Sequence, residues 1–198
     1  LEDGQIAKVS ARDFQVMQTD GQEVESMLLH LEEEWSESEL GDYPHFMLKE
    51  IHEQSESLQH CISGRLRHAE GTSVLGGLQI QPQNLAQLPH VRLIGCGTAL
   101  HAAQIGQILI EQWARVPAVS HVASEFNAND PVINPQALHL AISQSGETAD
   151  TLSAVKEIQR KGADVYGIVN VVGSSIARQC GKGVYIHSGP EQSVASTK

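Results

Sequence analysis

The chain has 198 residues, 40% of them hydrophobic, which is enough for one well-packed domain plus an appendage but too few for two full-sized domains. Its formal net charge of −11 and its 13 lysines and arginines argue against a nucleic-acid partner, because affinity for a phosphate backbone comes mainly from basic side chains. A single phosphorylated small molecule stays possible, because backbone amides at a helix N-terminus hold a phosphate without net positive charge.

The three cysteines, Cys61, Cys96 and Cys180, are far apart and form no CxxC pair, as is typical of reduced thiols in a cytosolic protein. No window approaches about 18 uninterrupted apolar residues, so we expect a soluble, cytoplasmic protein without a membrane partner. The chain starts at Leu1 and stops at Lys198 without a tail, which favours a piece of a longer polypeptide.

The first third of the chain predicts small elements. Residues 6–9 and 14–17 alternate in hydrophobicity around a polar link, which predicts a β-hairpin. An acidic run at residues 32–34, continued by Glu37 and Glu39, is typical of a solvated helix face or a linker. Residues 45–66 carry apolar side chains at loose helical spacing, which predicts a helix packed on the main domain.

From residue 91 onward, apolar runs alternate with helical stretches, the pattern of βαβ units and a parallel sheet. The predicted strands are residues 91–96, 119–123, 138–142, 165–171 and 184–187, and the predicted helices are residues 100–115, 148–160 and 174–178. The first helix should bury Ile105, Ile108, Leu109 and Trp113, and the second Leu152, Val155 and Ile158. We therefore predict an α/β fold with five short parallel strands flanked by helices, flavodoxin-like.

Three polar loops follow predicted strands, at residues 95–99, 143–148 and 172–175. Ligands of open parallel sheets bind beyond the carboxyl ends of the strands, so these loops are the candidate sites. The loop 95–99 lacks the third glycine of a dinucleotide fingerprint, and the histidines show no recognised zinc spacing. We therefore expect neither a cofactor nor a metal.

The strongest candidate is the loop 143–148, which places hydroxyl and amide side chains around Gly146 directly before a helix. The glycine lets the backbone approach a ligand closely, and the free amides and positive dipole of the first helical turn favour an anion. The candidate phosphate ligands are Ser143, Gln144, Ser145 and Thr148. A plain capped turn is the alternative, because serine, threonine and glycine are common at helix starts.

Several segments together resemble one enzyme family, the isomerising glutamine-fructose-6-phosphate aminotransferases. The segments that carry this resemblance are residues 43–54, 95–98, 123–126, 143–152, 173–175 and 194–198, in the family's order and spacing. The resemblance covers nearly the whole chain. It implies that residues 1–42 are the end of a glutaminase-like domain with a linker, and that residues 43–198 are a first SIS (sugar isomerase) domain.

The family's phosphate loop maps onto residues 143–148, and its sugar contacts fall on Thr98, Ala99, Val194 and Ser196. The resemblance further implies fructose 6-phosphate or glucosamine 6-phosphate as ligand and a homodimeric parent. Because the family's catalytic groups lie in the glutaminase domain and in a second SIS domain, both missing here, we expect no catalytic residue in this chain.

Two positions depart from the family pattern. Ala99 stands where the family has a serine that contacts the substrate, and Ser193 stands where glycine is usual. The first departure leaves open the alternative that the chain is a related sugar-phosphate deglycase or isomerase. The glutaminase-like hairpin is evidence against this alternative. A non-catalytic module that senses a phosphosugar is a further alternative.

Overall fold

A computed structural model of the chain describes residues 1, 4–24 and 40–198. The chain divides into two units, Leu1–Glu39 and Leu40–Lys198. In the first unit, strands β1 (Gln5–Val9) and β2 (Phe14–Gln18) pair antiparallel with Val9 opposite Phe14, which confirms the predicted hairpin. The predicted acidic helix face or linker lies outside the described residues.

The second unit contains a five-stranded sheet in the order β6-β5-β7-β8-β9, and every pairing in it is parallel. Its strands are β5 (Val91–Gly95), β6 (Ala118–Val122), β7 (Leu138–Ser143), β8 (Val165–Val169) and β9 (Gly183–Tyr185). The predicted α/β fold is confirmed, and the predicted strand ends differ from the observed ones by a few residues at most.

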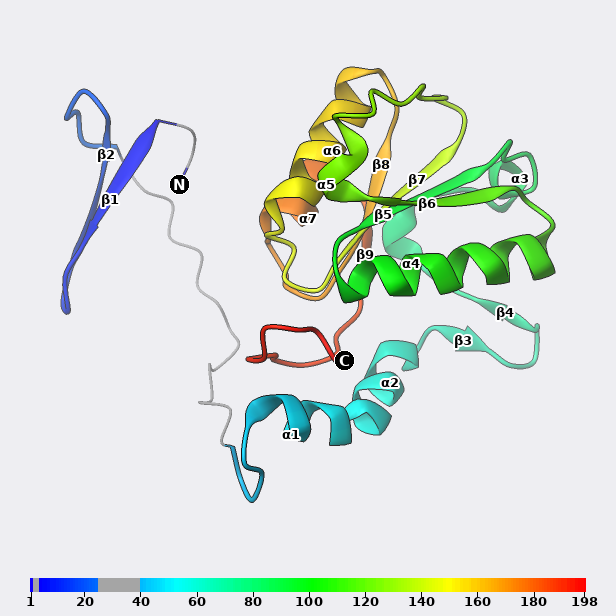
Figure 1. The fold of residues 1–198 in the computed structure, drawn as a ribbon, viewed down its shortest axis with the longest axis horizontal. Coiled ribbons are helices and arrows are strands. Elements are labelled where there is room, and N and C mark those ends of the chain that lie inside the picture. Colours follow the sequence, from blue (N-terminus) through cyan, green and yellow to red (C-terminus); the bar gives the residue numbers. More distant parts are fainter. Residues whose placement is uncertain (2–3, 25–39) are drawn as a thin grey trace. The chain divides into compact units, whose positions relative to one another are not determined.

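Helices cover both faces of this sheet (Figure 1). Helix α4 (Thr98–Leu109), continued by a π-helical turn (Ile110–Ala114), lies on one face. On the other face lie α5 (Ala123–Phe126), α6 (Ala149–Arg160) and α7 (Ser175–Cys180). Val155 and Ile158 of α6 are fully buried and Leu152 packs against them, as the helical spacing predicts.

The inward face predicted for the helix 100–115 is wrong for Ile105 and Ile108 of α4 and for Trp113 of the π-helical turn, which are all exposed. The helix instead turns its small residues toward the sheet. Ala103 is fully buried, and a Cβ at Gly106 would lie 3.3 Å from a methyl group of Leu93. A helix that approaches a sheet through alanine and glycine packs closely, and its large apolar side chains are left outside.

The single helix predicted over residues 45–66 is also wrong. Two helices, α1 (Phe46–His52) and α2 (Gln54–Ile62), are separated by Glu53, whose side chain is engaged with Lys49 and Lys198. The remaining short elements are β3 (Leu66–Arg67), β4 (Thr72–Ser73), a 3₁₀ turn (Gly76–Leu78) and α3 (Pro82–Leu85). Among the described residues, no helix is long and apolar enough to cross a membrane.

Candidate phosphosugar site

The loop 143–148 connects the carboxyl end of β7 to the N-terminus of α6. Ser143 is buried, and its Oγ accepts a hydrogen bond from the backbone N–H of Gly146 at 3.0 Å and lies 3.1 Å from Thr148 Oγ1. Thr148 is the N-cap of α6, yet its side chain caps no amide of the helix. The first-turn amides of α6, which have no acceptor within the helix, are therefore left without a side-chain cap.

Both the backbone conformation at position 146 and the atoms around it require a glycine there. Its φ is +68°, in the left-handed region, and a Cβ there would lie 2.0 Å from Ser174 Oγ. Its carbonyl accepts a hydrogen bond from the N–H of Ile176 at 2.9 Å. The turn is thus pressed against the start of α7, and the second and third polar loops of the sequence meet at this point.

Glu147 is the acidic residue of the loop, and its carboxylate accepts a hydrogen bond from the N–H of Ser175 at 2.7 Å. This hydrogen bond, with a further contribution from the positive charge of Arg178, lowers the pKa of Glu147 against the opposing effect of partial burial. The carboxylate therefore caps α7.

The loop 95–99 lies at the same edge of the sheet, because β5 and β7 are parallel neighbours with Ile94 opposite Ala141. A Cβ on Gly95 would lie 3.1 Å from the backbone carbon of Ala99, so the loop folds back tightly on the end of its strand. Gly97 has φ +56° and is the N-cap of α4, which has no side-chain cap either. Thr98 is exposed and Ala99 is half-buried.

Asn170, which sequence reasoning missed, joins the loop 143–148 to the C-terminal segment, residues 188–198. Its N–H donates to the carbonyl of Gln144 at 3.1 Å. Its side chain accepts from the N–H of Ser188 and donates to the carbonyl of Gly189, both at 2.8 Å. The predicted strand 165–171 included this residue, but a polar side chain at the carboxyl end of a parallel strand was the signal that could have found it.

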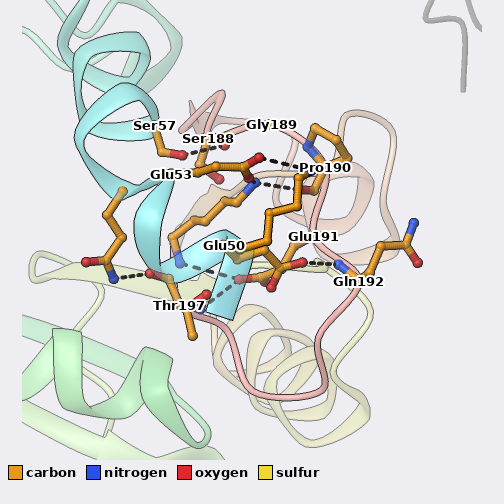
Figure 2. A network of polar contacts seen from close by, with 12 residues as sticks. Glu50, Glu53, Ser57, Ser188, Gly189, Pro190, Glu191, Gln192 and Thr197 are labelled. Carbon is orange, nitrogen blue, oxygen red and sulfur yellow. Dashed lines mark hydrogen bonds and ion pairs between the residues drawn. The ribbon is translucent and has the colours of Figure 1, made fainter. Parts of the chain in front are cut away.

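The C-terminal segment carries the other two candidate sugar contacts. Val194 is fully exposed and Ser196 is half-buried. The base of the segment is held by carboxylates of α1 and of the residue that follows it, Glu50 and Glu53 (Figure 2). Sequence reasoning missed both carboxylates, since only their contacts with a segment about 140 positions away identify them.

All four predicted phosphate ligands therefore share one turn, and the other candidate residues lie on the loop 95–99 and on a segment tied to that turn. In the part of the chain that the structure describes, no group of three or more histidine, cysteine, aspartate and glutamate side chains is arranged to hold a metal ion.

The model of the SIS domain family matches residues 84–198. Glutamine–fructose-6-phosphate aminotransferases [isomerizing] from Chlorobaculum tepidum and Bacteroides thetaiotaomicron are 42% and 43% identical to the chain across its whole length. The chain covers 32% of each, so it spans about a third of the length of these curated relatives.

Among solved structures, the C-terminal domain of glucosamine-fructose-6-phosphate aminotransferase from Francisella tularensis superimposes with a TM-score of 0.69 and 33% identity. The match covers 81% of this chain and 44% of that one. Glucosamine-6-phosphate deaminase from Thermotoga maritima superimposes with a TM-score of 0.59 and 18% identity, which shows a likeness of fold alone. The match covers 77% of this chain and 43% of that one.

Proposed function

Because this chain belongs to the SIS domain family, we propose that residues 43–198 are the first SIS domain of an isomerising glutamine-fructose-6-phosphate aminotransferase and that they bind fructose 6-phosphate. The observation that carries the proposal is the uncapped N-terminus of α6, where the hydroxyl of Thr148 turns to Ser143. The full-length identity to aminotransferases supports the choice of enzyme.

The cradle suits a phosphate without a lysine or arginine. The first-turn amides of α6 and the positive end of its dipole favour an anion, and Ser143, Gln144, Ser145 and Thr148 add polar side chains. Hydrogen bonds to a charged group contribute about 1.5–3 kcal/mol each, so three or four of them hold one phosphate. The carboxylate of Glu147 keeps its charge but is held at the N-terminus of α7 by the hydrogen bond from Ser175.

The sugar would lie between the loop 95–99 and the C-terminal segment. Thr98 and the backbone at Ala99 are the contacts proposed on the first, and Val194 and Ser196 those on the second. Glucosamine 6-phosphate, which carries the same phosphate, would bind in the same place.

The parent protein would make glucosamine 6-phosphate from fructose 6-phosphate and glutamine, with residues 1–42 as the end of its glutaminase-like domain and with a second SIS domain and a dimer partner. Ile105 and Ile108, exposed on α4, and Trp113, exposed on the π-helical turn that continues it, support the presence of such further domains. Three free cysteines, Cys61, Cys96 and Cys180, are in keeping with a cytoplasmic enzyme. This chain alone would catalyse no reaction. Formation of glucosamine 6-phosphate by the purified chain supplied with ammonia would contradict that expectation.

Calorimetric titration tests the binding proposal. We expect fructose 6-phosphate and glucosamine 6-phosphate to bind and fructose not to bind, and we expect the double variant Ser145→Ala with Thr148→Ala to lose most of the affinity. Ser55→Ala, on the exposed face of α2, removes a hydroxyl elsewhere and serves as the control. Binding that ignores the phosphate, or that survives the double substitution undiminished, would reject the cradle.

Ala99 favours one second candidate, a related deglycase or isomerase that acts on another phosphosugar, because a serine hydroxyl expected by the resemblance is missing there. A phosphosugar that binds more tightly than fructose 6-phosphate in the same titration would favour this candidate.

A further inference from the structure

Glu50 is a buried carboxylate on α1 that binds the C-terminal segment, about 140 residues away in sequence. One of its oxygens, Oε1, accepts from the N–H of Gln192 at 2.6 Å and from the N–H of Ser193 at 3.2 Å. The other, Oε2, accepts from the hydroxyl of Ser193. Figure 2 shows the carboxylate of Glu50 facing this stretch of backbone from the helix.

These contacts keep Glu50 charged. Burial on its own raises the pKa of Glu50, but the hydrogen bonds from Ser193 and Gln192 and the nearby charge of Lys198 outweigh it and lower the pKa overall. A charged acceptor strengthens each of the three bonds, so the two peptide units before Val194 are held in one orientation.

A second set of contacts closes the segment on itself (Figure 2). The ammonium of Lys198 is 2.5 Å from Glu53 Oε2 and 2.9 Å from the carbonyl of Pro190. The carboxylate of Glu191 accepts from the N–H of Thr197 at 2.7 Å. The base of the loop is thus tied at several points, while its tip at Val194 is fully exposed.

From this arrangement we infer that Glu50 is a positioning residue for sugar recognition: its carboxylate holds the backbone that presents Val194 and Ser196 to the sugar. The inference rests on the proposed function, which places sugar contacts at these two residues. In this inference, Glu50 itself contacts no ligand. The phosphate cradle, which is anchored by Ser143 and Asn170, does not depend on Glu50.

Substitution of Ser193 can weaken the interaction between Glu50 and the C-terminal segment without abolishing it. Its hydroxyl has one proton and two acceptors within reach, Glu50 Oε2 and the carbonyl of Ala195 at 3.0 Å, and the charged carboxylate is the stronger partner. Replacing Ser193 by alanine removes one of the three bonds to Glu50 and leaves both backbone bonds intact. Glu50→Gln removes the charge, so the two backbone bonds to Oε1 become weaker neutral bonds, and it places an amide N–H₂ where Oε2 accepts from the Ser193 hydroxyl.

The test measures the affinities of the full 198-residue chain for fructose 6-phosphate and for inorganic phosphate, together with hydrogen–deuterium exchange. For Glu50→Gln we expect fructose 6-phosphate to bind about tenfold more weakly, the equivalent of about 1.4 kcal/mol, while the affinity for inorganic phosphate stays within about twofold. Exchange should rise in residues 189–198 and stay unchanged in residues 143–160. Ser193→Ala should show the same pattern at about threefold, and it carries the test if Glu50→Gln fails to fold. Glu56→Gln, exposed on α2, is the matched control and should behave like the wild type.

The results separate the two claims. Unchanged binding of fructose 6-phosphate by Glu50→Gln refutes the inference alone. An equal loss of affinity for both ligands, accompanied by exchange throughout the domain, also refutes it, because Glu50 would then support the fold in general. A wild-type chain that binds neither ligand refutes the proposed function, and the inference falls with it.

Discussion

The carboxylate of Glu147 lies 2.7 Å from the backbone nitrogen of Ser175 and caps the helix that follows β8. Glu147 belongs to the candidate phosphate loop, whereas Ser175 begins α7, so one hydrogen bond joins two loops at the carboxyl edge of the sheet. The bond holds this charged carboxylate at the N-terminus of α7.

Glu147→Ala should destabilise the domain by about 1 kcal/mol, because it removes a side-chain acceptor at the N-terminus of α7. Urea denaturation at neutral pH measures the loss. Lys156→Ala, on the exposed face of α6, should change the free energy of unfolding by less than about 0.5 kcal/mol. Equal effects of the two substitutions would show that the cap contributes nothing specific.

Gly146→Ala should be more costly than Gly173→Ala. Both glycines have positive φ, +68° and +72°, so alanine is strained by about 1–2 kcal/mol at either site. Only at position 146 would the new Cβ also collide with Ser174, since Gly173 has open space around it. The difference in unfolding free energy between the two variants measures the collision, and Ser174→Gly should recover part of it. No difference would contradict the close packing of this turn on α7.

Acidification should destabilise the fold through three histidines near Arg92, of which one is buried and two are half-buried. His139 is fully buried, and its Nε2 lies 3.0 Å from the carbonyl of Asn134, so the neutral ring carries its proton on Nε2. Burial, together with the charge of Arg92, lowers the pKa of His139, and the bond to Asn134 offsets this only in part. The pKa values of His90 and His121 are lowered by burial and by Arg92 in the same direction.

Because these pKa values lie below the unfolded value of about 6.5, the unfolded chain binds more protons, and stability is lost as the pH falls below about 6.5. Each such histidine contributes at most about 1.4 kcal/mol per pH unit. The glutamates with lowered pKa values act at lower pH, so unfolding free energies between pH 7 and pH 5 isolate the histidines. His139→Met should flatten this dependence, and a slope equal to that of the wild type would contradict the prediction.

Ala99→Ser should tighten the binding of fructose 6-phosphate about five- to tenfold, because one added hydroxyl contributes about 1 kcal/mol when it meets a sugar oxygen. The affinity for inorganic phosphate should not change, since the cradle is untouched. Calorimetry with both ligands makes the comparison. A weaker complex with fructose 6-phosphate would instead favour a different sugar for this site.

The sequence was enough to predict the sheet, its parallel strands and the turn that follows β7. These features depend on local patterns, because apolar runs of five or six residues form buried strands, and glycine with serine and threonine marks a strand-to-helix turn. Val155 and Ile158 were predicted to be buried for the same reason: the sheet covers one whole stripe of α6.

The face of α4 could not be predicted in this way. Both of its sides carry apolar residues, and periodicity favoured the larger ones, Ile105, Ile108 and Trp113. The sheet surface at Leu93 instead accepts the side of Ala103 and Gly106, since close approach of the backbone excludes bulky side chains. Which side of the helix packs depends on the shape of its neighbour, which the helix's own sequence does not contain.

The residues of the candidate site also differ in whether the sequence alone predicts their role. Chain order alone brings Ser143 and Thr148 together in one turn, because they are five residues apart at a helix start. Glu50 and Asn170 acquire their roles only when the chain has folded, since their partners, Ser193 and Ser188, lie 143 and 18 residues further along the chain. Short-range geometry follows from residue identity and spacing, whereas the hydrogen bonds that lower the pKa of Glu50 against the effect of its burial are created by the packing of α1 against the C-terminal segment.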